Sequence, residues 1–324
     1  MLLGNQSARD ALAAAMASGA LHHAWLLAGP EGVGKGMFAR IAAARMLAEA
    51  LEPQRLAPGW DVPESTQTAH LLASGAHPDF RALTRLPKDP DKPDEALARS
   101  ITIAQVRTLQ PLFATKPALS PRRVILIDAI DDLERGGANA LLKNLEEPPQ
   151  GTIFLLVSHA PGRLLPTIRS RCRLLRFEAL SDGDVSQVVR GALPDASPDE
   201  IAALVRAGEG SPGRALGFAG LDIAALEGEM MRLAESGDPT NAIRARLARL
   251  LGTKAAQPRY EAFLDRVPSF IAAQAKSITG ERLRTALDAY AAASDLAGAA
   301  RGLSLDAGAT VFEMGGLLAR LSGR

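Results

Sequence analysis

The segment GPEGVGKG at residues 29–36 contains the residue types that bind phosphate groups. Its glycines let backbone N–H groups approach an anion closely, and Lys35 can reach the outer phosphates of a nucleotide. In the phosphate-loop pattern G-x-x-x-x-G-K-[ST], a hydroxyl follows the lysine and binds the magnesium ion that accompanies the nucleotide. Gly36 stands in that position here. The segment therefore predicts phosphate binding with a weakened metal site.

Hydrolysis of a nucleotide needs acidic groups, which the sequence offers at residues 124–132. Asp128 ends the apolar run VILID, where such folds hold the magnesium shell. The next residue is Ala129, whose methyl group cannot polarise an attacking water. Asp131 and Asp132 could partly substitute if the backbone turned sharply, or they could cap or solvate the next helix. The sequence leaves both alternatives open.

Three other polar residues have simpler interpretations. Glu146 and Glu147 precede Pro148, so we expect them to end a helix rather than act as bases. His159 follows an apolar run, and we expect it to be a loop residue rather than a ligand.

Short apolar runs must position these groups. They lie at residues 24–29, 124–128, 153–158 and 174–177 and are too continuously apolar for half-exposed strands. Such runs are typical of parallel strands covered by helices on both faces. The segments at residues 52–67 and 86–96 are rich in proline and lack periodicity, so they predict surface loops.

After residue 180 the strand signal disappears and helical spacing takes over. Ser197, Pro198 and Glu200 have the types and spacing of a capped helix start, predicting a helix over residues 197–208. We predict three domains: an α/β nucleotide-binding-like domain at residues 1–178, a small helical lid at 179–221 and a C-terminal helical domain at 222–324.

Composition limits the function classes. The 324 residues include 37 basic and 36 acidic side chains, so no global positive field favours nucleic-acid binding by the chain alone. The single cysteine, Cys172, cannot form an internal disulfide and fits a reducing compartment. Because the sequence shows neither a signal peptide nor a membrane span, we expect a soluble, cytoplasmic protein.

Four motifs together resemble the delta-prime subunit family of the bacterial DNA polymerase III clamp loader, which is part of the AAA+ superfamily. They are LHHAWLLAGPEGVGKG, NALLKNLEEPP, LLPTIRSRC and GSPGRAL, in that order along the chain. The resemblance extends from about residue 4 to residue 216. It implies an AAA+ P-loop parallel sheet with a helical lid, followed by an all-α collar domain for oligomerisation.

The resemblance also implies roles for particular residues. Lys35 matches the phosphate-loop lysine, Asp128 the Walker B aspartate and Ser158 the sensor 1 position. Arg171 in SRC matches the arginine finger inserted into a neighbouring subunit's site, and Arg214 matches the sensor 2 arginine. Without the resemblance, Arg171 is better interpreted as a solvated surface residue, and Arg214 could equally be a surface charge of a capped helix. The implied nucleotide-binding residues are Gly29, Gly32, Gly34, Lys35, Gly36, Asp128, Ser158 and Arg214, with Arg171 catalytic in trans.

Many relatives carry a four-cysteine zinc module where this sequence has residues 47–80. Tetrahedral zinc needs several thiolates or imidazoles, and this stretch contains only His70 and His77. We therefore predict no zinc and no protein metal ligands. We expect no required cofactor and at most weak binding of ATP or ADP with magnesium.

The leading hypothesis is a hydrolysis-poor wall of a clamp-loader ring that gives an arginine finger to a motor subunit during DNA replication. Its expected partners are the motor (gamma/tau) and delta subunits and, indirectly, the sliding clamp and primer-template DNA, with no membrane. An autonomous AAA+ ATPase of the motor type is the alternative. A stand-alone nucleic-acid-binding module is disfavoured because aromatic residues make up only 4% of the chain.

Overall fold

The computed structural model describes residues 2–89, 91 and 97–323, which form two compact units. Unit 1 extends to Asp184 and also includes Gly210–Gly213, whereas unit 2 contains Val185–Glu209 and the chain from Arg214 onward. The finer division into three domains at residues 178 and 221 stays a prediction. The predicted site residues lie in unit 1, except for Arg214.

Unit 1 is built on a five-stranded parallel sheet with the strand order β2-β3-β4-β1-β5. The strands are β1 (Ala24–Ala28), β2 (Phe80–Thr84), β3 (Arg123–Asp128), β4 (Thr152–Ser158) and β5 (Arg173–Arg176). The four apolar runs are confirmed as strands. β2 was not predicted, because its sequence FRALT has only one buried side chain and so no continuous apolar run.

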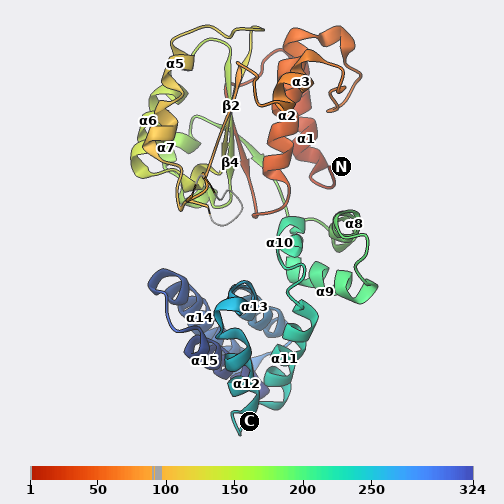
Figure 1. Ribbon diagram of the computed structural model, residues 1–324, viewed down its shortest axis with the longest axis vertical. Helices are drawn as coiled ribbons and strands as arrows, with labels where there is room; N and C mark the ends of the chain where they lie inside the picture. Colours follow the sequence, from red (N-terminus) through yellow and green to blue (C-terminus); the bar gives the residue numbers. More distant parts are fainter. Residues whose placement is uncertain (1, 90, 92–96, 324) are drawn as a thin grey trace. The chain divides into compact units, whose positions relative to one another are not determined.

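Helices cover both faces of this sheet (Figure 1). One layer contains α1 (Gln6–Ala17), α2 (Lys35–Leu51) and α3 (Gln67–Ala73), and the other contains α5 (Gln110–Phe113), α6 (Arg135–Glu146) and α7 (Pro166–Arg169). The short α4 (Ile103–Arg107) packs against α6. Every residue of β1 and β4 is buried, as expected of strands between two helical layers. The predicted α/β fold is confirmed.

The proline-rich segment at residues 52–67 is ordered by polar contacts. It contains a 3-10 turn, η1 (Pro53–Arg55), and the guanidinium of Arg45 donates hydrogen bonds to the carbonyls of Ala57 and Asp61 at 2.8 and 3.1 Å. Trp60 packs edge-on against Phe38 of α2. Of the second predicted loop, residues 90 and 92–96 lie outside the described residues.

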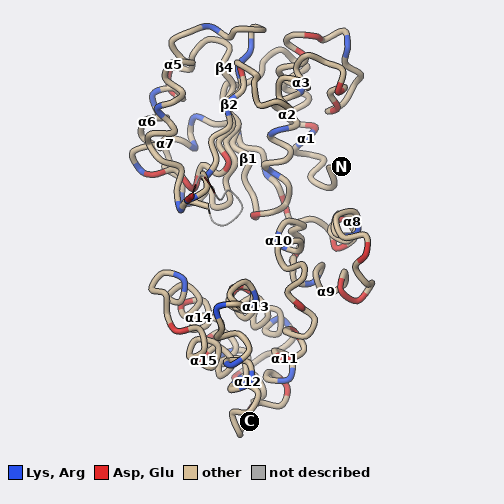
Figure 2. Tube along the Cα trace, viewed as in Figure 1, with Lys and Arg blue, Asp and Glu red and all other residues tan. Residues whose placement is uncertain are grey.

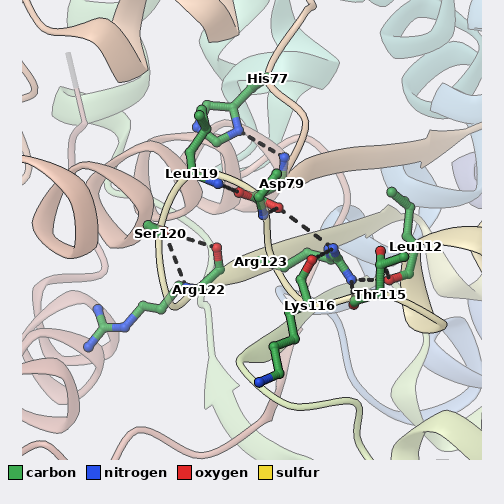
Figure 3. A network of polar contacts seen from close by, with 10 residues as sticks. His77, Asp79, Leu112, Thr115, Lys116, Leu119, Ser120, Arg122 and Arg123 are labelled. Carbon is green, nitrogen blue, oxygen red and sulfur yellow. Dashed lines mark hydrogen bonds and ion pairs between the residues drawn. The ribbon is translucent and has the colours of Figure 1, made fainter.

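A buried ion pair fixes the start of β3 (Figure 3). The carboxylate of Asp79 accepts hydrogen bonds from the backbone N–H groups of Ala118 and Leu119 at 2.7 and 2.8 Å, and Arg123 lies 3.7 Å away. The guanidinium of Arg123 donates to the carbonyls of Leu112, Thr115 and Lys116. Removing one partner of such a buried pair costs about 3–5 kcal/mol. The residues HPDF at 77–80 thus have a structural role in this chain.

In unit 2 the described structure is helical, as predicted for the C-terminal region. Its helices are α8 (Asp182–Ala192) and α10 (Pro212–Gly217), which both begin in unit 1, and α9 (Pro198–Gly208), α11 (Ile223–Ser236), α12 (Ala242–Leu251), α13 (Gln257–Ala275), α14 (Gly280–Leu303) and α15 (Ala307–Ala319). The predicted start of α9 is confirmed, because the Ser197 hydroxyl accepts a hydrogen bond from the Glu200 N–H at 3.2 Å. The buried alanines of α14 allow close packing against α13 and α15.

Charges of both signs are interspersed along both units (Figure 2), in keeping with a formal net charge of +1. Within the described residues, no helix is long and apolar enough to cross a bilayer.

Candidate nucleotide-binding site

The glycine-rich loop connects β1 to α2, which begins at Lys35. Gly32 and Gly34 have φ angles of 75° and 95°, which favour glycine. At Gly29 a Cβ atom would lie 2.0 Å from the carbonyl oxygen of Phe177. The backbone of this loop therefore requires glycine at these positions, independently of any ligand.

The side chain of Lys35 turns back onto the loop itself. Only 2% of the residue is exposed, and its ammonium group donates hydrogen bonds to the carbonyls of Gly29, at 2.7 Å, and Pro30. Burial lowers the pKa of Lys35 to about 8, against the opposing effect of the carboxylates of Glu31, Asp128 and Asp131. The cation that would bind phosphate is thus partly desolvated and already bonded within its own chain.

The next two carbonyls of the loop accept hydrogen bonds from the segment GSPG at residues 210–213. The hydroxyl of Ser211 donates to the Glu31 carbonyl at 2.8 Å, and the N–H of Gly213 donates to the Gly32 carbonyl at 2.9 Å. Four successive carbonyls of the loop, residues 29–32, therefore have donors from the same chain. This closed set of contacts stabilises the loop in its present shape.

Gly36, in the first turn of α2, lies against Asp128 at the end of β3. A Cβ atom added at Gly36 would lie 2.2 Å from Oδ2 of Asp128, so the carboxylate fills the space that a serine or threonine side chain would need. Ala129, which follows Asp128, is 3% exposed and offers only a methyl group. This donor set does not fit a magnesium ion held in the usual way, and the described residues contain no cluster of three or more potential metal ligands.

Asp131 links the ends of β3 and β4. Its carboxylate accepts hydrogen bonds from the Ser158 hydroxyl at 2.9 Å, the His159 N–H at 2.7 Å and the Ala160 N–H at 3.1 Å. The Ser158 hydroxyl therefore donates its hydrogen bond to a carboxylate of the same chain. Because Ser158 is fully buried, this bond also satisfies a group that water cannot reach.

Asp132 has a separate partner. It forms an ion pair with Arg85 at 3.1 Å, and burial raises its pKa, opposed by that arginine. The residue at the N-cap of α6 is Glu134, so neither aspartate caps that helix, and the capping part of this alternative was wrong. The use of Asp131 as a link between strands could not be read from the sequence, because its three donors come from about 30 residues further along.

Arg171 lies between α7 and β5, at the N-terminal end of an edge strand. Its guanidinium donates to the carbonyl of Thr167 at 2.8 Å and forms an ion pair with Glu146 at 2.6 Å, and its side chain is 33% exposed. Since the strands are parallel, the start of β5 and the ends of β1, β3 and β4 lie at opposite edges of the sheet. Arg171 is thus separated from the glycine-rich loop of its own chain.

The other predicted residues fall into two groups. The glycine-rich loop, Asp128 and Ser158 lie at the C-terminal edge of the sheet. Arg214 belongs to unit 2, where it forms an ion pair with Glu209 at 2.8 Å and lies over the ring of Phe218. Burial raises the pKa of the Cys172 thiol to about 12, so this cysteine is no nucleophile at neutral pH.

Comparison with known proteins agrees with the motifs. A family model described as DNA polymerase III, delta subunit, matches residues 4–181. The chain is 37% identical to the DNA polymerase III subunit delta-prime of Pseudomonas aeruginosa over 59% of its own length and 53% of that protein. It is 29% identical to the DNA polymerase III subunit tau of Escherichia coli over 72% of the chain and 34% of tau. The chain thus spans about half the length, or less, of these relatives.

Among solved structures, a DNA polymerase III gamma subunit-related protein of Thermotoga maritima aligns with 96% of the chain. The alignment covers 99% of that protein at 16% identity, with a TM-score of 0.45.

Proposed function

The chain belongs to the DNA polymerase III delta subunit family, and on this premise we propose that it is a delta-prime subunit of a clamp loader acting in DNA replication. The matched region covers the sheet unit that carries the loop and Arg171. Similarity to a protein named delta-prime, at 37% identity, supports this assignment. Its proposed partners are motor subunits of the gamma/tau type and a delta subunit, and through them the sliding clamp and primer-template DNA.

Little hydrolysis is expected at the chain's own site. The residue after Asp128 is an alanine, and loss of general-base assistance alone typically costs about 10² to 10⁴ in rate. Gly36 supplies no hydroxyl, and the Ser158 hydroxyl is bonded to Asp131. Lys35 and the glycine loop remain, which supports at most weak binding of ATP or ADP.

The proposed contribution to chemistry is Arg171, acting in trans. The observation that carries this proposal is its position at the opposite edge of the sheet from the chain's own loop, with a third of its side chain exposed. A guanidinium placed there cannot serve its own nucleotide site but is available to a neighbouring subunit. Where an arginine finger completes a nucleotide site, it contributes about 10³ to 10⁵ in rate.

An autonomous motor-type ATPase is the second candidate, favoured by the similarity to tau. Gly36 and Ala129 weigh against it, because both are positions where an active site of this type needs a polar side chain.

Steady-state ATPase measurements separate the two candidates. We expect the isolated chain to show negligible turnover and to co-purify with tagged motor and delta subunits, whose joint turnover rises when the chain is present. Turnover by the isolated chain at the rate of a motor subunit would refute the delta-prime assignment. Failure to assemble with motor and delta subunits would refute it independently.

A further inference from the structure

Arg171 is held by a residue whose role the proposed function leaves open. Glu146 is the last residue of α6, in the segment LEEPP, and its Oε1 lies 2.6 Å from Nη2 of Arg171. Nη1 of the same guanidinium donates to the carbonyl of Thr167 at 2.8 Å. Two elements that are distant in sequence, the end of α6 and the turn after α7, therefore meet at this one side chain.

These contacts restrain the guanidinium but leave some of its N–H donors available. An arginine side chain has five N–H donors in a planar fork. Nη1 donates to the Thr167 carbonyl and, at 3.4 Å, to the Ser170 hydroxyl, while Nη2 contacts Glu146. These contacts engage three donors and leave the Nε–H and one N–H of Nη2. The side chain stays 33% exposed. An unrestrained arginine loses rotamer freedom, worth up to about 2 kcal/mol, when it engages a phosphate. Contacts that already fix its direction reduce that loss.

We propose that Glu146 is a positioning residue for Arg171, directing the guanidinium toward the phosphates of a neighbouring subunit's nucleotide. The inference rests on the proposed function, because it needs Arg171 to act in trans. Glu146 itself touches no phosphate in this proposal. It acts through the orientation of Arg171 and thereby gives a functional reason for a glutamate at the end of α6, beyond ending the helix.

Glu147 provides a matched control. It is the next residue, carries the same charge and is exposed beyond the end of α6. Within the part of the chain that the structure describes, it takes part in none of the ion pairs. Glu146→Gln and Glu147→Gln therefore remove the same charge from adjacent positions, and only the first removes the ion pair with Arg171.

The test uses the loader reconstituted from the full chain with motor and delta subunits. An exposed or half-exposed ion pair is worth a factor of about two to five, so we expect Glu146→Gln to lower kcat of the stimulated ATPase about two- to fivefold. KM for ATP and assembly should stay unchanged, since the nucleotide is bound by the other subunit. Glu147→Gln should match the wild type. In an Arg171→Ala background, Glu146→Gln should have no further effect.

Several outcomes would overturn the inference. Equal rates for the two glutamine variants would show that the ion pair positions nothing, and a faster Glu146→Gln loader would show that Glu146 competes with phosphate for the guanidinium. An equal loss in the Arg171→Ala background would indicate a role unrelated to Arg171. If Arg171→Ala itself changes nothing, the proposed function fails and this inference fails with it. If Arg171→Ala lowers turnover but Glu146→Gln does not, only this inference fails.

A second measurement needs only the isolated protein. Phenylglyoxal modifies accessible guanidinium groups, and mass spectrometry gives the rate for each arginine. We expect Arg171 to react faster in Glu146→Gln than in Glu147→Gln, while the exposed Arg173 reacts equally in both. Equal rates at Arg171 would mean that Glu146 does not restrain the side chain in solution.

Discussion

Two cationic side chains of the same unit, Lys35 and Arg171, have opposite environments. Lys35 is 2% exposed and donates to carbonyls of its own loop, whereas Arg171 is 33% exposed with donors left over. They lie at opposite edges of one parallel sheet. A residue type that can bind phosphate therefore does not by itself mark a working site. The number of donors that remain free of internal partners decides what each cation can do.

The difference has an energetic side. For Lys35 to bind a phosphate, it must leave the Gly29 and Pro30 carbonyls, each bond being worth about 0.5–1.5 kcal/mol or more when an ion is involved. The loop must also accept a nucleotide without a metal ligand at Gly36. Arg171 can contact a phosphate through its remaining donors while keeping the bonds to Thr167 and Glu146.

The largest expected effect comes from removing the two cations separately in the reconstituted loader. Arg171→Ala should lower the turnover of the neighbouring site by about 10³ or more, because an arginine finger contributes that much to nucleotide hydrolysis. Lys35→Ala should leave stimulated turnover unchanged, because in the proposed function the chain's own site contributes no chemistry. Single-turnover ATP hydrolysis by the assembled loader measures both.

Arg173→Ala is the control for charge, since Arg173 is exposed close to Arg171 in the same segment. It should behave like the wild type. The comparison would be reversed if Lys35→Ala abolished turnover while Arg171→Ala did not.

The second effect concerns the pH dependence of stability. Because the pKa of Lys35 in the folded chain is about 8 and that of a free lysine is about 10.4, the unfolded state binds more protons between these values. The free energy of unfolding should therefore rise as pH rises through this window. This increase should be lost again as pH falls toward about 8. Lys35→Met lacks this titration. Between about pH 7.5 and about pH 9.5, we expect the free energy of unfolding of the wild type to increase by about 2 kcal/mol relative to that of Lys35→Met.

Urea unfolding of both proteins at the two pH values gives this difference. Parallel curves for the wild type and Lys35→Met would show that the Lys35 ammonium is well hydrated, contrary to its burial in the loop.

The sheet was predictable where local signals were strong. β1, β3 and β4 follow from continuous apolar runs, because strands buried on both faces need apolar side chains at every position. β5 was correctly predicted as a strand, but the expectation that it is covered on both faces was wrong: three of its four residues are exposed in this edge strand. β2 was not predicted, because it is only partly buried and lacks a continuous apolar run, although it pairs with β3 along its whole length. The start of α9 was correct because its cap is made by residues only three apart in sequence.

The site was predictable as a set of residue types but not as a set of contacts. The strand ends bring the loop, Asp128 and Ser158 together, as the parallel topology requires. The contacts that close the site come from far along the chain: Ser211 is 180 residues from Glu31. Likewise, Glu146 and Arg171 belong to different elements, and no periodic pattern records their ion pair. Such pairings depend on the completed fold.

The smallest expected effect comes from restoring a hydroxyl to the loop with Gly36→Ser, which tests whether the structure can accommodate a serine at this position. In Gly36→Ser the new Cβ would meet Oδ2 of Asp128 at 2.2 Å, so the carboxylate must move. Crowding of this kind costs about 1 kcal/mol. Gly298→Ser in α14 is the control, because a Cβ there meets nothing within 4 Å and a helical glycine is replaced by a better helix former.

We therefore expect Gly36→Ser to lower the free energy of unfolding and Gly298→Ser to leave it unchanged or raise it. Neither should hydrolyse ATP, because Ala129 still offers no group to orient water. If Gly36→Ser were as stable as the control and bound ATP more tightly with magnesium, Asp128 would be free to swing aside. The loop would then be one substitution from a metal site, and the contrast between Lys35 and Arg171 would reflect a single missing hydroxyl rather than a loop bonded to itself.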